Sequence, residues 1–231
     1  MSLKIDKLSA AYGQARALWD VSLDAAHGTV VGVLGRNGAG KTTLLRSIAG
    51  LHPRVQGSIL ADGSEIRGLR ADQIALHSVA LVREGGRLPS SLSVVENLQL
   101  GQRLARLRGK TGRPLTEIWK WFPILEPLQS RKAGLLSGGQ RQALALASAF
   151  VAEPSILLLD EPSAGLAPPV ARELFATISQ LAASGMTVLV VEQQPAWLIG
   201  LAQQCYLLEV GRVVDEGPVE KLIENAGNRL M

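Results

Sequence analysis

Short runs of apolar residues punctuate the sequence and predict the buried strands of a parallel sheet. Residues 30–34, 155–159 and 187–191 each contain almost no polar position, which is the pattern of a strand covered on both faces. A glycine-rich loop and a helix follow the first run, and a helical stretch near residues 168 to 183 separates the other two. Strands that alternate with helices are typical of an α/β fold.

Two segments depart from this alternation. Residues 58–66 contain an Asp-Gly turn, and residues 209–214 contain a glycine turn between short extended runs, so both predict antiparallel hairpins. No buried strand is expected from about residue 92 to 152, where leucine and aromatic positions fall in amphipathic or loop-broken helical sequence. We therefore expect one domain, residues 1–231, with an antiparallel β subdomain and an inserted α-helical subdomain at about residues 85–152.

Composition is that of an ordinary folded protein. The sequence is 47% hydrophobic and 19% charged, and its formal net charge of +4 at pH 7 is too modest to indicate nucleic acid, which we do not expect as a partner. The one cysteine, Cys205, lies in an apolar stretch and is expected to be a buried hydrophobe, as suits a reducing compartment. Because neither a signal-peptide pattern nor an apolar run of about 18 residues occurs, a cytoplasmic location is expected.

The basic and histidine residues give no clear site. The densest basic run is interpreted as a solvated helix and loop, with contact to lipid headgroups or an acidic partner as the alternative; it comprises Arg103, Arg106, Arg108, Lys110 and Arg113. The histidines are too scattered to assemble a metal site and receive no role: His27, His52 and His77.

A phosphate-binding loop is the strongest signal in the chain. Residues 35–42 read Gly-Arg-Asn-Gly-Ala-Gly-Lys-Thr and match the P-loop pattern between a buried strand and a helix. Glycines let successive backbone N–H groups turn toward one anion, and the helix N-terminus adds partial positive charge. Lys41 is expected to reach the β- and γ-phosphates, and Thr42 to bind Mg²⁺. The expected nucleotide contacts are Gly35, Asn37, Gly38, Ala39, Gly40, Lys41, Thr42 and Thr43.

Two carboxylates follow the leucine run at residues 157–159. Asp160 and Glu161 stand at the end of a buried strand, where open α/β sheets bind their ligands. Asp160 suits Mg²⁺ binding, directly or through water, and Glu161 suits polarising an attacking water. Taken alone, an Asp-Glu pair before Pro162 is more often a polar strand end or a helix cap, so the catalytic interpretation depends on the phosphate loop.

A second glycine motif precedes a helix predicted over residues 141–151. Ser137 and Gln140 have the spacing of a capping box, which would explain the motif by folding alone. Gly138 and Gly139 between them lower helix propensity, however. Their presence indicates that another group approaches the backbone closely.

Residues 136–140, Leu-Ser-Gly-Gly-Gln, resemble the signature motif of ABC ATPases, lying between the phosphate loop and the Asp-Glu strand. The resemblance covers nearly the whole chain and implies a P-loop NTPase with a RecA-like parallel sheet that hydrolyses ATP with Mg²⁺. In that family two such domains face each other head to tail, and the signature helix of one binds the γ-phosphate held by the other. It thus implies nucleotide contacts in trans from Ser137, Gly138, Gly139 and Gln140.

Other positions follow the order of the family. Tyr12, expected ahead of the first strand pair, resembles the aromatic residue that stacks on adenine, although strand packing would explain a lone tyrosine. Residues 163–166 resemble the loop that communicates between the two ATP sites. Ala167 replaces the aspartate that commonly ends this loop.

Two departures concern the γ-phosphate. Glu84 stands where most members carry a glutamine that senses the γ-phosphate, and it is expected to contact nucleotide and Mg²⁺. Gln193 replaces the switch histidine and is the third expected catalytic residue beside Lys41 and Glu161. The alternative for Gln193 is a cap on the segment before Pro195.

Because of Glu84, Gln193 and Ala167, together with residues 95–98 and 121–123, the sequence resembles the histidine-lacking ATPase of branched-chain amino acid importers. The resemblance implies a peripheral protein on the inner face of the membrane. Its partners would be a second ABC ATPase, identical or different, two transmembrane permease subunits and, through them, a solute-binding protein. An ABC exporter subunit and a non-transport ABC ATPase are the alternatives. Ala143 and Ser148 stand where the signature helix usually carries arginines.

Overall fold

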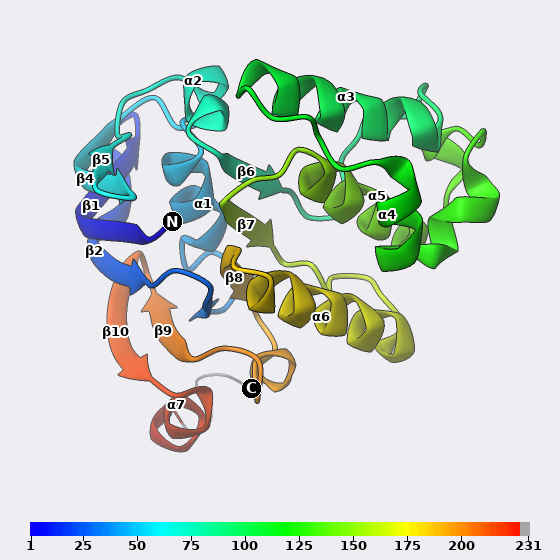
Figure 1. The fold of residues 1–231 in the computed structure, drawn as a ribbon. Helices are drawn as coiled ribbons and strands as arrows, with labels where there is room; N and C mark the ends of the chain where they lie inside the picture. Colours follow the sequence, from blue (N-terminus) through cyan, green and yellow to red (C-terminus); the bar gives the residue numbers. More distant parts are fainter. Residues whose placement is uncertain (227–231) are drawn as a thin grey trace.

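The structure is a computed structural model that describes residues 1–226. A six-stranded sheet with the order β10-β9-β3-β8-β7-β6 forms its centre (Figure 1). Neighbouring strands run parallel except for the antiparallel pair β9 and β10. The strands are β3 (Val30–Leu34), β6 (Val79–Val82), β7 (Ile156–Asp160), β8 (Thr187–Glu192), β9 (Gln204–Glu209) and β10 (Arg212–Gly217).

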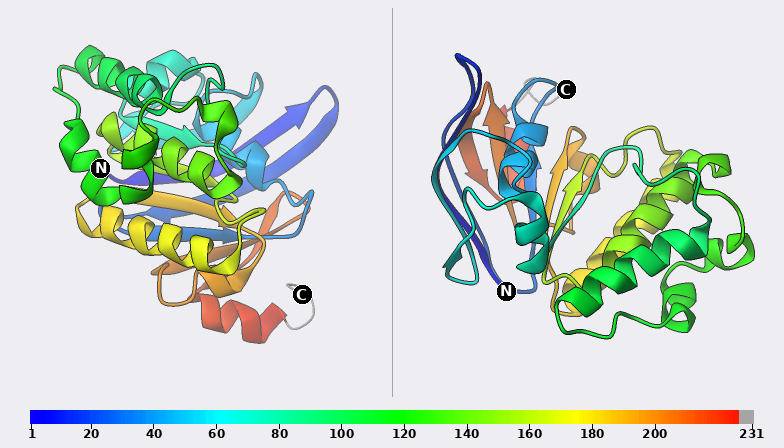
Figure 2. Two further views of the ribbon diagram at one scale, coloured as in Figure 1. Left: turned by 90° about the vertical axis from the view of Figure 1, so that its right-hand side faces the viewer. Right: turned by 90° about the horizontal axis from the view of Figure 1, so that it is seen from above.

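Helices and a second sheet cover the two faces of this sheet. Every residue of β3, β7 and β8 is buried. An antiparallel sheet of order β2-β1-β4-β5 and helix α1 (Lys41–Ile48) lie on one face of the central sheet, and longer helices lie on the other (Figure 2). Leu44, Leu45 and Ile48 of α1 are fully buried between the two sheets. The strands of the second sheet are β1 (Leu3–Tyr12), β2 (Ala15–Ala25), β4 (Val55–Ala61) and β5 (Ser64–Glu65).

Between β6 and β7 the chain forms helices and turns, apart from one bridge between Ser93 and Lys132. Helices α3 and α5 pack closely because Gly101 has no side chain; a Cβ there would lie 2.4 Å from the carbonyl oxygen of Ser148. The α-helices within residues 1–226 are α1 (Lys41–Ile48), α2 (Ala71–Leu76), α3 (Val94–Leu107), α4 (Leu115–Trp121), α5 (Gly138–Val151), α6 (Pro168–Ala183) and α7 (Val219–Ala226). The short 3₁₀ helices are η1 (Pro123–Leu128), η2 (Ala133–Leu135) and η3 (Pro195–Trp197).

Most of the predicted elements are confirmed. The three apolar runs are β3, β7 and β8, the stretch at 168 to 183 is α6, and both hairpins are present as β4–β5 and β9–β10. The helix expected from residue 141 begins at Gly138, and its capping box is formed: the Ser137 hydroxyl accepts from the Gln140 N–H at 3.3 Å. Cys205 is buried, which raises the pKa of its thiol to about 12.

One expectation is wrong, and another is confirmed only in part. Tyr12 does not precede the first strand pair but ends β1, directly before the turn into β2. The basic run is solvated only in part, because Arg108 donates to the carbonyl oxygens of Ala75 and Ala152 at 2.7 and 2.8 Å. Lys110 and Arg113 also bind within the chain, to the carbonyl oxygen of Glu153 and the carboxylate of Glu117, whereas Arg103 and Arg106 are exposed. Within residues 1–226, no helix has both the length and the apolar character needed to cross a membrane.

Candidate active site

The phosphate loop is held between β3 and the turn that joins β9 to β10. At its start, Gly35 donates its N–H to the Glu192 carbonyl oxygen at 3.3 Å, and a Cβ on Gly35 would lie 2.5 Å from the Leu208 carbonyl oxygen. At its end, Gly40 takes a left-handed φ of 109° that turns the loop into α1. The first N–H groups of α1 have no acceptors within the helix, so the loop and the helix end together are suited to bind an anion.

Lys41 is almost fully buried, with 4% of its surface exposed. Its Nζ donates to the carbonyl oxygens of Gly35 at 2.7 Å and Arg36 at 3.1 Å, and it pairs with Glu161 Oε1 at 3.0 Å. The three donors of the ammonium group therefore have three acceptors. Without such partners a buried charge would be very costly.

Glu161 directly follows β7, and its carboxylate contacts Lys41. Its backbone has a left-handed φ of 45°, and its N–H donates to the Val191 carbonyl oxygen at 3.0 Å. While Oε1 pairs with Lys41, Oε2 accepts from the Gln193 side-chain amide. Within the described part of the chain, no side chain caps η3, and of the three residues expected to be catalytic, Lys41 and Gln193 each contact Glu161.

Asp160 and Thr42 meet at the same edge of the sheet. The Thr42 hydroxyl donates to Asp160 Oδ1 at 3.1 Å. Burial raises the pKa of Asp160, and the charges of Glu161 and Glu84 raise it further, against the bond from Thr42 and the charge of Lys41. A divalent cation would relieve this excess of negative charge, and hydroxyl and carboxylate oxygens are ligands that Mg²⁺ accepts. The residues present therefore fit a Mg²⁺ ion.

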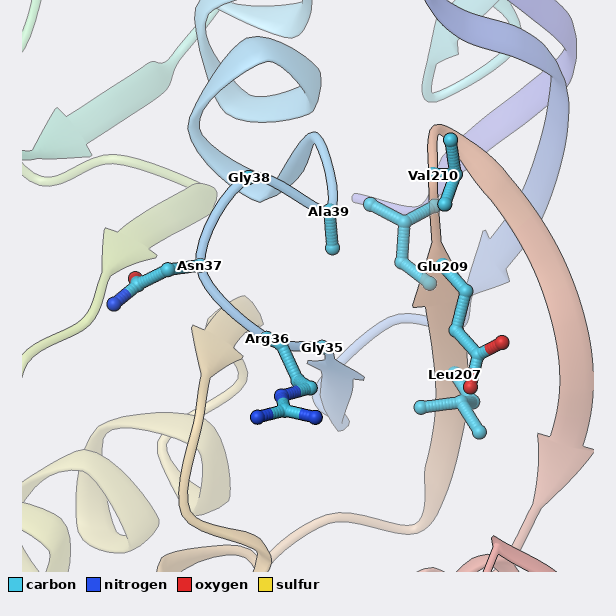
Figure 3. Close-up of a pocket in the computed structure, with 9 residues that line it drawn as sticks. Gly35, Arg36, Asn37, Gly38, Ala39, Leu207, Glu209 and Val210 are labelled. Carbon is cyan, nitrogen blue, oxygen red and sulfur yellow. The ribbon is translucent and has the colours of Figure 1, made fainter. Parts of the chain in front are cut away.

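Lys41, Thr42 and Glu161 line one cavity of about 420 Å³. Glu84, which follows β6, and Gln193, which follows β8, line this cavity together with residues of the phosphate loop. The lining also includes Ala164 of the loop at residues 163–166, and three residues that no sequence motif marks: Arg16, Ala17 and Val210. A second cavity, of about 500 Å³, lies between the loop and the β9–β10 turn (Figure 3). The phosphate loop thus lines both cavities, and Lys41 and Glu161 line the first.

Tyr12 is the last residue of β1 and precedes the turn that leads to Arg16, which lines the first cavity. Its ring makes an edge contact with the His52 ring, with 4.5 Å between ring centroids and an interplanar angle of 74°, while 48% of the tyrosine stays exposed. His52 is buried, which lowers its pKa. The sequence assigns His52 no role, yet its ring packs against the ring of Tyr12.

The signature residues lie apart from the cavity, at the N-terminus of α5. Gly139 is required by packing, because a Cβ there would lie 2.7 Å from Val170 Cγ1 of α6. At Gly138 a Cβ would meet nothing within 4 Å, so packing within this chain does not explain that glycine. This chain does not bring its own signature residues to its own phosphate loop.

A phosphate loop that faces a strand-end carboxylate pair, on a parallel sheet, defines a P-loop ATPase. The family model described as ABC transporter matches residues 18–164. The chain is 40% identical to the high-affinity branched-chain amino acid transport ATP-binding protein BraG of Pseudomonas aeruginosa, over 96% of this chain and 95% of the relative. It is 35% identical to the probable branched-chain amino acid transport ATP-binding protein LivF of Archaeoglobus fulgidus, over 96% and 94% of the two chains.

Solved structures agree with this assignment. The chain is similar to the ATP-binding cassette MJ1267 in its ADP conformation, with a TM-score of 0.80 and 27% identity over 98% of this chain and 94% of that one. A nucleotide-free ATP-binding cassette of an ABC transporter gives a TM-score of 0.85 at 24% identity, covering 100% and 98%. The chain belongs to the ABC transporter ATP-binding protein family and is an ABC ATPase. The P-loop NTPase fold is confirmed, whereas the roles of single residues remain predictions.

Proposed function

We propose that this chain binds and hydrolyses MgATP as the motor subunit of an importer for branched-chain amino acids or a related small polar solute. The observation that carries the proposal is the convergence of Lys41, Glu161 and Gln193 in one cavity beside Thr42 and Asp160. The solute class is supported by the names of the relatives that are 40% and 35% identical. Relatives named for glutamate/aspartate and phosphonate import, 31% and 36% identical, also support an importer.

In the proposed reaction, phosphate oxygens replace the acceptors that Lys41 now uses. Once Lys41 turns to the β- and γ-phosphates, Glu161 Oε1 loses its ion pair and becomes available to a water molecule. That water attacks the γ-phosphorus and gives a proton to Glu161, while the bond to the β–γ bridging oxygen breaks. Thr42, Asp160 and Glu84 would hold Mg²⁺, which would neutralise charge on the phosphates.

The site also implies partners. Because the signature residues of this chain lie away from its own phosphate loop, a second ABC ATPase, identical or different, would supply the signature helix that contacts the γ-phosphate. The structure that shows a dimeric cassette with ADP and phosphate has the same fold as this chain at 24% identity. Two permease subunits would anchor the assembly at the inner face of the membrane, and a solute-binding protein would deliver the solute. Residues 85–152 would act as one helical subdomain between the motor and the permeases.

Purification from the native host through a tag on this chain tests the proposal. The permeases and a second ATPase should co-purify, and the binding protein encoded with them should be stabilised against heat by leucine, isoleucine or valine in a ligand panel. Stabilisation by an unrelated solute would contradict the proposed substrate class. Recovery of the chain without any membrane subunit would contradict the importer itself.

Tyr12→Ala should weaken binding of MgADP by about 5- to 150-fold, because base stacking on an aromatic ring contributes about 1–3 kcal/mol. Binding of Mg-pyrophosphate should not change, since it has no base. Tyr12→Phe keeps the ring and serves as the matched control. Titration calorimetry with both ligands measures this, and unchanged MgADP affinity in Tyr12→Ala would show that the ring does not contact adenine.

Gln193→Ala should lower turnover by the equivalent of one hydrogen bond to a charged group, about 1.5 to 3 kcal/mol. The side chain touches Glu161 directly, and an amide cannot titrate near neutral pH. The wild type should therefore show no step near pH 6.5 from this position, whereas Gln193→His should keep some activity and add such a step. Steady-state ATPase assays from about pH 5.5 to 8.5 measure both effects. Full activity of Gln193→Ala across this range would remove Gln193 from catalysis.

A further inference from the structure

Glu192 ends β8 beside the proposed catalytic residues, and only 2% of its surface is exposed. Its Oε1 accepts the backbone N–H of Ser163 at 3.0 Å, and its Oε2 accepts the backbone N–H of Gln193 at 3.2 Å. Its own carbonyl oxygen accepts the N–H of Gly35 at 3.3 Å. One residue therefore joins three segments: the loop at residues 163–166, the segment of Gln193 and the start of the phosphate loop.

Gln193 continues this connection into the active site. Its side-chain amide donates to Glu161 Oε2, and Glu161 Oε1 pairs with Lys41 Nζ at 3.0 Å. Lys41 in turn donates to the carbonyl oxygen of Gly35 at 2.7 Å. These contacts form a closed ring. It starts at the carboxylate of Glu192, passes through Gln193, Glu161 and Lys41 to Gly35, and closes where the N–H of Gly35 donates to the backbone carbonyl oxygen of Glu192. Ser163 is attached to this ring from outside.

A carboxylate at this position is costly for folding. Burial raises the pKa of Glu192, and the charge of Glu161 raises it further, while the bonds from Ser163 and Gln193 act in the opposite direction. The other residues of β8 from Val188 to Val191 are apolar and fully buried, so an apolar side chain would suit the strand end without that cost. The two acceptor atoms are what an apolar side chain could not provide.

The loop that Glu192 holds belongs to the site. Ala164, next to Ser163, lines the cavity that contains Lys41 and Glu161. The N–H of Ala164 also donates to the Glu161 carbonyl oxygen at 3.1 Å. A shift of this loop would therefore displace both the carboxylate of Glu192 and the backbone of Glu161, because each is hydrogen-bonded to the loop.

We infer that Glu192 is a positioning residue. It fixes the position of Gln193 relative to the loop at residues 163–166, and through Gln193 it fixes the carboxylate of Glu161. The inference rests on the proposed ATPase function and adds a regulatory input to it. A movement of the loop changes the alignment of the group that polarises water. Nucleotide affinity depends on the phosphate loop and changes little.

Glu192→Gln tests this with a side chain of nearly the same size. The amide keeps one acceptor oxygen and places an NH₂ donor against an N–H, so one of the two bonds is lost. Turnover of the complex purified through a tag on this chain should fall about 10- to 100-fold, as expected for one hydrogen bond to a charged group. The KM for MgATP and the affinity for MgADP should stay within about twofold, because the phosphate loop keeps its own contacts. Glu126→Gln on exposed η1 is the matched control and should behave as the wild type.

A double-mutant cycle separates positioning from a general structural role. If Glu192 acts through Gln193, then Glu192→Gln should change turnover less than about twofold in the Gln193→Ala background. Multiplicative effects would overturn the inference, and so would wild-type turnover in Glu192→Gln. Absence of MgATP hydrolysis by the wild-type complex would overturn the proposed function and, with it, this inference. If the wild type hydrolyses MgATP and Glu192→Gln does so at the same rate, the inference is overturned while the proposed function stands.

Discussion

Lys41→Ala is expected to abolish MgATP hydrolysis and to weaken MgATP binding at least tenfold, since each hydrogen bond between charged groups contributes about 1.5–3 kcal/mol. Lys41 is the buried cation at the phosphate loop, and its three acceptors show that the ammonium group needs full compensation there. Phosphate oxygens would provide that compensation when ATP binds. The variant leaves the backbone of the phosphate loop in place, so the loss of MgATP affinity measures the contribution of the lysine side chain.

Two variants control the lysine experiment. Lys4→Ala removes an exposed lysine from β1 and should bind MgATP as the wild type does. Lys41→Arg keeps the charge, but a planar guanidinium cannot replace a compact ammonium group among the carbonyl oxygens of Gly35 and Arg36, so it should bind poorly too. Wild-type affinity of Lys41→Ala in an ATP titration would show that Lys41 does not bind the phosphates.

Glu161→Gln is expected to keep MgATP binding and to lose about 10² to 10⁴ in turnover, the contribution of a positioned general base. The amide has nearly the same size and still reaches Gln193, but it cannot take a proton from water. It also carries no charge to pair with Lys41, so the variant should bind nucleotide at least as tightly as the wild type. With hydrolysis blocked, ATP should hold a dimer that the wild type forms only transiently.

Steady-state hydrolysis and size-exclusion chromatography, with excess MgATP and the partner ATPase present, measure both effects. Glu153→Gln changes a partly exposed carboxylate outside the cavity and is the matched control. Unaltered turnover in Glu161→Gln would remove the residue from catalysis. A protein that stays monomeric under these conditions would contradict a signature helix supplied by a second subunit.

Patterns within short stretches of sequence predicted the buried strands and the phosphate loop. The strands β3, β7 and β8 are apolar throughout because both of their faces are covered, and the loop between β3 and α1 carries its own glycine signal. Strand β6 was not predicted, because its apolar run of four residues, Val79–Val82, is too short for periodicity to separate a strand from a helix segment. The start of α5 was placed late because glycines at its first two positions lower helix propensity.

Contacts between distant segments could not be predicted. Val210 reaches the active-site cavity only because β9 pairs with β3 beside the phosphate loop. Arg108 is held by carbonyl oxygens 33 and 44 residues away, so its sequence neighbourhood gave the wrong prediction of a solvated side chain. Glu192 was passed over for the same reason, since its bond to Ser163 spans 29 residues.

Phosphate release from MgATP, by the complex purified through a tag on this chain, tests most directly that the chain is the motor of a transporter. The wild-type complex should release phosphate about 10² to 10⁴ times faster than the complex with Glu161→Gln, and the solute-loaded binding protein should raise only the wild-type rate. Equal rates for the two complexes would show that the cavity at Lys41 and Glu161 is not the site of hydrolysis.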